Sequence, residues 1–184
     1  MHIYAGLLFL ADGVEKVIAV GTFGRKLQCR EARTGGRIVT AKIMRISKSC
    51  ARAVRKEAEI LARINKRDSC RTSLCVRMLE HFRCKGHHCI VFEGLGMSLR
   101  SFMKKHFCAD RQCPHGFALL HVSVFTRQLL NAVAFMHDAK LVHRNLTPEN
   151  IYLTDTSSGV ITFPNGFSSP KDIHVKGRFI LISR

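Results

Sequence analysis

The pattern of apolar and polar positions in the first half of the chain predicts an antiparallel sheet. Runs rich in β-branched residues partly alternate with polar ones, and short glycine turns separate them. The turn at Lys85-Gly86 is a hairpin signal between two such runs. The predicted strands cover residues 14–20, 25–32, 37–46, 75–82 and 88–95.

After the third predicted strand, the apolar period becomes that of a helix. Residues 47–67 form an amphipathic pattern that Ser47 or Ser49 can cap. The second half predicts helices over 98–107 and 117–140, a short strand over 150–153 and a loop over 157–170. On the longest helix, one apolar face is expected to comprise Val122, Phe125, Leu129, Val133 and Met136.

Composition makes the chain globular and strongly basic. Of its 184 residues, 46% are hydrophobic and 23% charged, and the formal net charge is +17. Such a field attracts RNA, phosphorylated protein or an acidic partner surface, although a solvated basic face without a partner has the same composition. No apolar run reaches the roughly 18 residues of a membrane span, so we expect no membrane partner.

Cysteine usage indicates an intracellular protein. Without a clear export signal, the eight cysteines are interpreted as reduced thiols, and we expect a nuclear or cytoplasmic location. The stretch "HFRCKGHHC" over 81–89 does not have the ligand spacing of a standard zinc site. Its simpler interpretation is a hairpin turn.

Several residues could act on phosphate groups. The turn from Gly21 to Gly24 lies between two predicted strands, where backbone N–H groups can approach an anion. Lys42 lies in the third predicted strand, and a carboxylate on the following helix, Glu57 or Glu59, could hold it in place. Phosphoryl transfer needs such positioning and neutralising groups.

These parts occur in the order found in protein kinases, and three longer stretches strengthen the likeness. "VRMLEHF", "HCIVFEGLGMSLRSFM" and "KLVHRNLTPENIY" resemble segments of the LAMMER, or CDC-like, kinases. The resemblance covers residues 14–155. It implies an α+β, protein-kinase-like fold. A five-stranded antiparallel N-lobe with helix C is expected over 1–95, and a partial, mostly helical C-lobe through the catalytic loop over 96–184.

The resemblance also implies roles for individual residues. Gly21 and Gly24 would cover the phosphates of ATP, while Lys42 would contact them and pair with Glu57. Asn150 would hold a Mg²⁺ ion. The implied adenine site consists of the gatekeeper Phe92 and the hinge residues Glu93, Gly94 and Leu95. The implied catalytic loop contains His143, Arg144 and Asn145.

The chain departs from the kinase pattern at functional positions. An Asn145 amide replaces the catalytic aspartate, and it can orient a hydroxyl but cannot take its proton. The metal-binding Asp-Phe-Gly motif is missing, and the two possible alignments place Pro164 or Asn165, or else Gly177, near its position. The other departures are Ala19 for a glycine, Lys26 for a valine, Thr147 for a lysine and Tyr152 for a smaller apolar residue.

Three functions follow from these observations. The first is a truncated LAMMER-like serine/threonine, or dual-specificity, kinase domain that binds ATP but is catalytically impaired, like a pseudokinase. The second is an active kinase of Arg/Ser-rich proteins. The third is a basic scaffold for RNA, a phosphorylated protein or another acidic partner.

Overall fold

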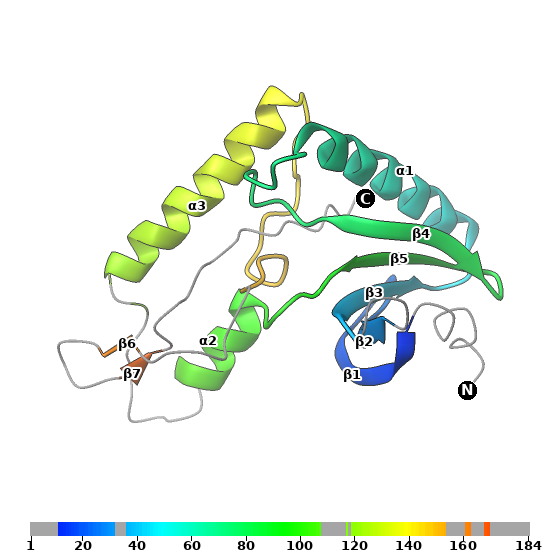
Figure 1. Cartoon of the computed structure of the whole chain (residues 1–184), viewed down its shortest axis with the longest axis horizontal. Helices are drawn as coiled ribbons and strands as arrows, with labels where there is room; N and C mark the ends of the chain where they lie inside the picture. The colour runs from blue at the N-terminus through cyan, green and yellow to red at the C-terminus, as the bar shows by residue number, and fades with distance from the viewer. Residues whose placement is uncertain are drawn as a thin grey trace. The chain divides into compact units, whose positions relative to one another are not determined.

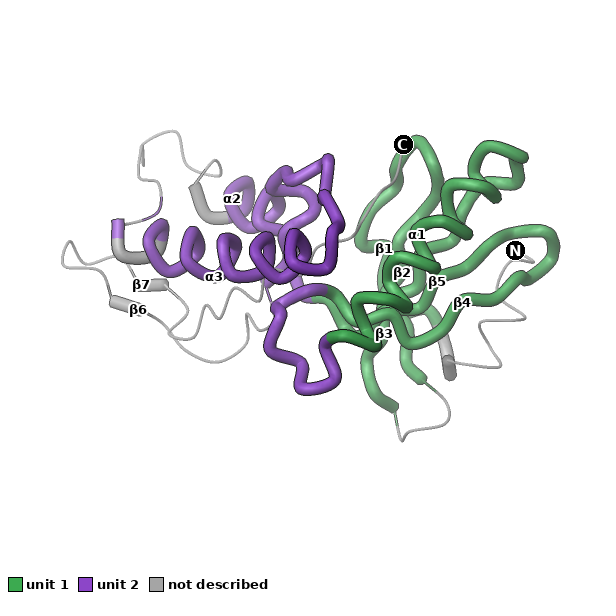
Figure 2. The backbone as a smooth tube through the Cα atoms, turned by 90° about the horizontal axis from the view of Figure 1, so that it is seen from above, with its two compact units in different colours: residues 1–67, 76–95, 181–184 green, residues 68–75, 96–180 purple. Residues whose placement is uncertain are grey.

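The computed structural model describes residues 11–31, 36–107, 117, 119–153, 161–162 and 168–169. The chain divides into two compact units (Figure 2). Among the described residues, the first unit comprises 11–67 and 76–95, with the gap at 32–35, and the second comprises 68–75 and those from 96 onward.

The first unit is a five-stranded antiparallel sheet with one helix. The strand order is β1-β2-β3-β5-β4 (Figure 1). This arrangement confirms the fold class expected from the sequence. The elements are β1 (Ala11–Gly21), β2 (Gly24–Glu31), β3 (Ile38–Met44), α1 (Lys48–Arg67), β4 (Met78–Cys84) and β5 (His87–Glu93).

Local turn chemistry fixes the hairpins. Thr22 and Phe23 connect β1 to β2, as the glycine pattern predicts. Lys85 and Gly86 connect β4 to β5 with φ angles of 46° and 85°. Positive φ at both central residues matches the right-handed twist of a hairpin, and glycine adopts it at little cost.

The two faces of the sheet differ in character. One carries an apolar cluster of Leu27, Cys29, Val39, Ala41, Ile43, Cys89 and Val91. The opposite face carries the alternate residues of β3 and β5, including buried Lys42 and Phe92. Helix α1 packs against β3, β4 and β5 (Figure 1).

Helix α1 forms as its pattern predicts. Ser47, and not Ser49, is its cap, since the Ser47 hydroxyl accepts a hydrogen bond from the Cys50 N–H at 3.1 Å. The predicted apolar face is buried and joins the unit's core. The side-chain amide of Asn65 donates a bond of 2.6 Å to the Met78 carbonyl, which ties the helix end to β4.

The second unit is mainly helical. It contains α2 (Leu99–Phe107), α3 (Leu119–Asp138), β6 (Ile161–Thr162) and β7 (Ser168–Ser169). Its core brings together Phe102 of α2, Phe125 of α3, and Ile151 and Leu153 of the following loop.

Two details of the second unit differ from expectation. Residues 150–153 do not form a strand, because Tyr152 makes only an isolated bridge to Ser98. The sequence predicts Val122 on the apolar face of the long helix, but its side chain is 43% exposed. Ala132, which was not expected on that face, is fully buried. In the described part of the chain, no helix combines the length and apolar character needed to cross a bilayer.

Candidate functional site

A buried ion pair lies between the sheet and α1. The Nζ of Lys42 is 2.8 Å from Oε1 and 2.7 Å from Oε2 of Glu57. Strand β3 and helix α1 thus bring together two residues 15 positions apart. The alternative partner, Glu59, is exposed. Burial raises the pKa of Glu57, and the Lys42 ammonium opposes that rise.

Lys26 lies beside this pair. It is directly opposite Lys42 in the β2–β3 register, so the two side chains share one face of the sheet. Burial and the nearby Lys42 charge lower the pKa of Lys26 from 10.5 to about 8, while Glu57 has the opposite effect. The sequence marked Lys26 only as an unusual replacement for valine, because its proximity to the ion pair depends on strand register.

The two predicted glycines have different surroundings. A Cβ at Gly24 would be 2.0 Å from the Ile43 carbonyl oxygen and 2.9 Å from the Met44 Cα. A Cβ at Gly21 would meet nothing closer than the Gly24 oxygen at 3.9 Å. The close approach of β2 and β3 therefore requires glycine at position 24 but not at position 21.

The predicted hinge residues follow one another at the end of β5. Phe92 is fully buried. The Glu93 carboxylate accepts a hydrogen bond of 3.0 Å from the Arg77 N–H, and the Glu93 N–H donates one of 3.1 Å to the Arg77 carbonyl. A Cβ at Gly94 would be 2.7 Å from the Ile38 carbonyl oxygen, so the chain passes closely over β3.

A hydroxyl from β3 engages the hinge backbone. The Leu95 N–H donates a hydrogen bond of 3.1 Å to Oγ1 of Thr40, and both residues are buried. An adenine that used this amide would have to replace the hydroxyl. Sequence reasoning missed Thr40, since a contact across 55 positions leaves no local pattern.

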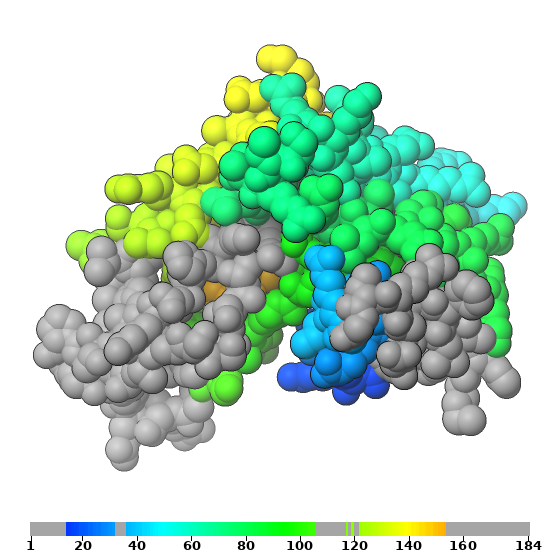
Figure 3. All heavy atoms as spheres, in the orientation of Figure 1, coloured from blue at the N-terminus to red at the C-terminus, as the bar shows by residue number. Residues whose placement is uncertain are grey.

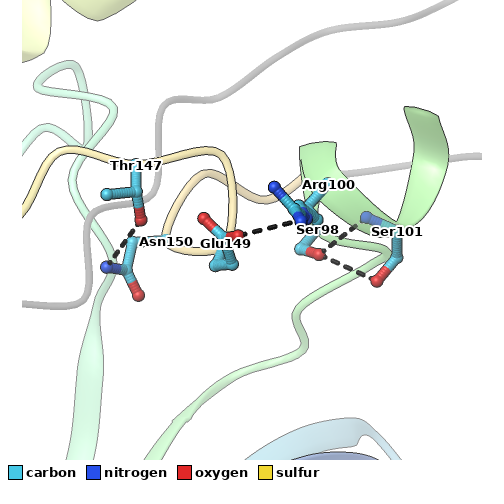
Figure 4. A network of polar contacts seen from close by, with 6 residues as sticks. All are labelled: Ser98, Arg100, Ser101, Thr147, Glu149 and Asn150. Atoms are coloured by element: carbon cyan, nitrogen blue, oxygen red, sulfur yellow. Dashed lines mark hydrogen bonds and ion pairs between the residues drawn. The ribbon is translucent and has the colours of Figure 1, made fainter. Parts of the chain in front are cut away.

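The predicted catalytic loop is held by its own polar groups. The Asn145 N–H donates a bond of 3.3 Å to Nδ1 of His143, whose pKa is lowered by burial. The Asn150 side-chain nitrogen donates a bond of 3.0 Å to the Asn145 carbonyl. It also donates one of 3.3 Å to the Thr147 hydroxyl (Figure 4). Arg144 has a φ of 67°, a conformation that costs a non-glycine residue about 1–2 kcal/mol. The structure thus brings together Asn145 and Asn150.

Helix α2 supports the end of this loop. The Arg100 guanidinium is 3.2 Å from a carboxylate oxygen of Glu149 (Figure 4). The Leu99 N–H donates a hydrogen bond of 2.8 Å to the Ile151 carbonyl. Next to these contacts, Tyr152 is buried, which raises its pKa to about 12.

Among the described residues, Asn150 is the one expected ligand of Mg²⁺. Magnesium prefers oxygen ligands, carboxylates above all. The described residues contain no cluster of three or more His, Cys, Asp or Glu side chains that could hold a metal. Asn150 offers one amide oxygen, and its amide nitrogen is used within the loop. The alternative positions of the missing motif, Pro164, Asn165 and Gly177, lie outside the described residues.

Comparisons with known proteins agree with this fold. The family model "Protein kinase domain" matches residues 13–163. A crystal structure of another kinase domain superposes with a TM-score of 0.74 at 26% identity, covering 94% of this chain and 51% of that one. The chain therefore belongs to the protein kinase family.

The more similar relatives place the chain in the LAMMER branch and confirm that resemblance. Dual specificity protein kinase CLK2 of Homo sapiens is 37% identical over 143 residues, which are 78% of this chain and 28% of the relative. Serine/threonine-protein kinase AFC3 of Arabidopsis thaliana is 39% identical over 156 residues, which are 85% of this chain and 37% of the relative. The chain thus spans between about a quarter and about two fifths of the length of these relatives.

Proposed function

We propose that this chain is a LAMMER-type protein kinase domain that binds ATP and transfers its phosphoryl group poorly, as a pseudokinase does. The observation that carries nucleotide binding is the buried Lys42–Glu57 ion pair. In this proposal residues 1–95 form the ATP-binding lobe, and residues 96–184 form a partial lobe with the catalytic loop.

The phosphate end of the nucleotide is the better supported part of the proposed site. Glu57 holds the Lys42 ammonium with two hydrogen bonds, so the cation is oriented before a ligand arrives. Lys42 would contact the phosphates, and Gly21 would let the backbone approach them. Gly24 supports this turn by allowing β2 and β3 to approach closely.

The adenine end would lie against Phe92 and the hinge from Glu93 to Leu95. Backbone groups of Glu93 and Leu95 are already hydrogen-bonded in the structure. A base would therefore exchange existing hydrogen bonds for new ones, and the net gain per bond is only about 0.5–1.5 kcal/mol. We expect weak nucleotide binding for this reason.

Impaired phosphoryl transfer follows from the catalytic loop and the metal ligands. The Asn145 amide cannot act as a general base, a contribution of about 10²–10⁴-fold. The larger loss is the missing metal-binding aspartate, because the β- and γ-phosphate charge is then poorly neutralised. Asn150 would orient the loop through its bonds to Asn145 and Thr147.

A thermal melt and a phosphotransfer assay test this function together. We expect ATP to raise the melting temperature of the wild type but not of Lys42→Met. We also expect phosphate incorporation into an Arg/Ser-rich peptide to equal the Lys42→Met background. Incorporation that Lys42→Met abolishes would instead establish the active-kinase alternative, and a melt indifferent to ATP would contradict nucleotide binding.

The same assay should include Asn145→Asp. Restoring the carboxylate supplies a general base but no metal site. General-base catalysis contributes at least about 10²-fold to a rate, and we expect phosphate incorporation to rise by much less than that. A gain above that would show that the amide is the main defect and that magnesium is adequately held.

A second candidate function rests on the outer face of α1, which would bind an acidic or phosphorylated protein segment. Most of the exposed side chains of this helix are cationic, and Figure 3 shows α1 atoms, cyan to blue-green, at the surface. Its exposed charges are Lys48, Arg52, Arg55, Lys56, Glu59, Arg63, Lys66 and Arg67. Binding of a phosphorylated Arg/Ser peptide that persists at high salt would support this function, while binding of RNA alone would favour an unspecific polyanion surface.

A further inference from the structure

The face of the sheet that carries the Lys42–Glu57 ion pair holds a second cation. Lys26 on β2 is the direct cross-strand neighbour of Lys42 on β3. Side chains at such positions project from the same face, with Cβ atoms about 4.5–5.5 Å apart. Two lysine side chains therefore project from the face of the sheet on which Lys42 meets the Glu57 carboxylate.

The carboxylate cannot balance both cations equally. Both oxygens of Glu57 accept hydrogen bonds from Lys42, at 2.8 and 2.7 Å. Lys26 is only partly exposed and feels the repulsion of Lys42 together with the attraction of Glu57. Repulsion between two ammonium groups on one face is unfavourable, and a bound anion would relieve it. The cluster is therefore suited to an anion.

We propose that Lys26 and Lys42 together form a site for the polyphosphate of a nucleotide bound without a divalent metal ion. This inference rests on the proposed function and adds the residue that takes over charge neutralisation. The described residues hold no group of three or more His, Cys, Asp or Glu side chains that could bind a metal, and in this proposal cations of the protein itself match the phosphate charge. Lys26 supplies one at the position where a valine is expected.

A two-cation site should have two measurable properties. Inorganic tripolyphosphate, which lacks a base, should bind in EDTA through the same two ammonium groups. The affinity should also depend on the protonation of Lys26, whose pKa is about 8 in the free protein. The charged groups that act on Lys26 include Lys42 from β3 and Glu57 from α1. Affinity for the anion should therefore fall as the pH rises through about 8.

Isothermal titration calorimetry of the full chain in EDTA, with ATP and separately with inorganic tripolyphosphate, tests the inference. Lys26→Met should weaken both ligands by about tenfold, the value of one charge-assisted hydrogen bond. Lys26→Arg should keep the affinity at neutral pH. The matched control is Lys105→Met, which removes one exposed charge from α2, outside the proposed binding surfaces, and should bind both ligands as the wild type does.

A pH series separates a binding role of Lys26 from a structural one. Arginine remains charged, so the wild-type affinity relative to Lys26→Arg should fall between pH 7 and 9. Comparing the two proteins cancels the titration of tripolyphosphate itself. A constant ratio would overturn the inference even if Lys26→Met were poorly folded.

The outcomes also distinguish this inference from the proposed function. If ATP binds wild type and Lys26→Met equally, or binds only with Mg²⁺, the two-cation site is refuted and nucleotide binding stands. If tripolyphosphate binding depends on Lys26 but ATP binds no more tightly than tripolyphosphate, the anion site stands and the nucleotide function fails. Absence of binding by either ligand, with or without Mg²⁺, would overturn both.

Discussion

The backbone N–H of Leu95 donates a 3.1 Å hydrogen bond to the hydroxyl oxygen of Thr40. One residue lies in the proposed adenine hinge and the other in the strand that carries Lys42. A buried amide must be satisfied, and here a side chain of the protein does so. A nucleotide therefore competes with Thr40 for this donor.

Removing the competing hydroxyl should strengthen nucleotide binding and weaken the fold. In Thr40→Val the Leu95 N–H loses its acceptor, so the free energy of unfolding should fall by about 1 kcal/mol. Affinity for ATP should rise by roughly three- to tenfold, because the ligand no longer displaces an internal bond. Calorimetry and urea unfolding measure the two effects. Thr40→Ser keeps the acceptor and should resemble the wild type in both.

The Lys42–Glu57 pair should matter for stability as well as for binding. Glu57→Gln leaves a buried ammonium with a weaker partner, so unfolding free energy should fall by on the order of 2–4 kcal/mol. Glu59→Gln changes an exposed carboxylate on the same helix and should stay within about 0.5 kcal/mol of the wild type. Urea denaturation of the two variants measures both changes in unfolding free energy. Equal effects would mean that the ion pair adds nothing beyond an exposed charge.

Replacing that pair with apolar residues should separate stability from function. The double variant Lys42→Met/Glu57→Leu leaves no buried charge at these two positions and should recover most of the stability lost in Glu57→Gln. It should still show no melting-temperature increase with ATP. Recovery of both properties would contradict a phosphate-binding role for Lys42.

The two glycines of the β1–β2 turn should respond differently to alanine. Gly24→Ala places a methyl group 2.0 Å from the Ile43 carbonyl, so the strands must separate and unfolding free energy should fall by on the order of 3 kcal/mol or more. In Gly21→Ala the methyl group meets only an ordinary van der Waals contact at 3.9 Å, so unfolding free energy should stay within about 0.5 kcal/mol of the wild type. Thermal melts of both variants measure this difference in stability. A stable Gly24→Ala protein would show that β2 and β3 are not so closely packed.

Lys26 should make stability depend on pH. Its pKa is about 8 in the folded chain against 10.5 for an unperturbed lysine, so between these values the unfolded state binds more protons. Stability linked to Lys26 is therefore lowest below pH 8 and rises toward pH 10.5. At pH 7 the unfolding free energy of Lys26→Met should exceed that of the wild type by on the order of 1–3 kcal/mol. This difference should shrink as the pH rises. Urea unfolding from pH 7 to 9.5 measures this difference.

The sheet and the long helices could be predicted because their signals are local. Strand alternation, the Lys85-Gly86 turn and the amphipathic period of α1 each act over a few residues. The short strand over 150–153 was wrong for a related reason. Its last three residues have the side chains of a strand. Ile151 and Leu153 pack against Phe102 and Phe125, and Tyr152 makes a single bridge, so no strand ladder forms.

The site was predictable only where the chain carries a family motif. Lys42 and Glu57 could be named because both belong to the kinase pattern, and the structure selected Glu57 over Glu59. The positions of Lys26 beside Lys42 and of Thr40 beneath Leu95 follow from strand register and from a contact between distant segments. Neither relationship has a periodicity or a spacing that a single sequence can show.

The packing around Gly24 and Gly94 also bears on how such a sequence would drift over generations. At both positions a side chain would collide with a backbone carbonyl of β3, at 2.0 and 2.7 Å. Selection for a folded sheet alone would therefore preserve these glycines in a lineage that had abandoned its ligand. Evolutionary decay of activity should first become visible at positions such as Gly21, where the architecture tolerates change and only the ligand would forbid it.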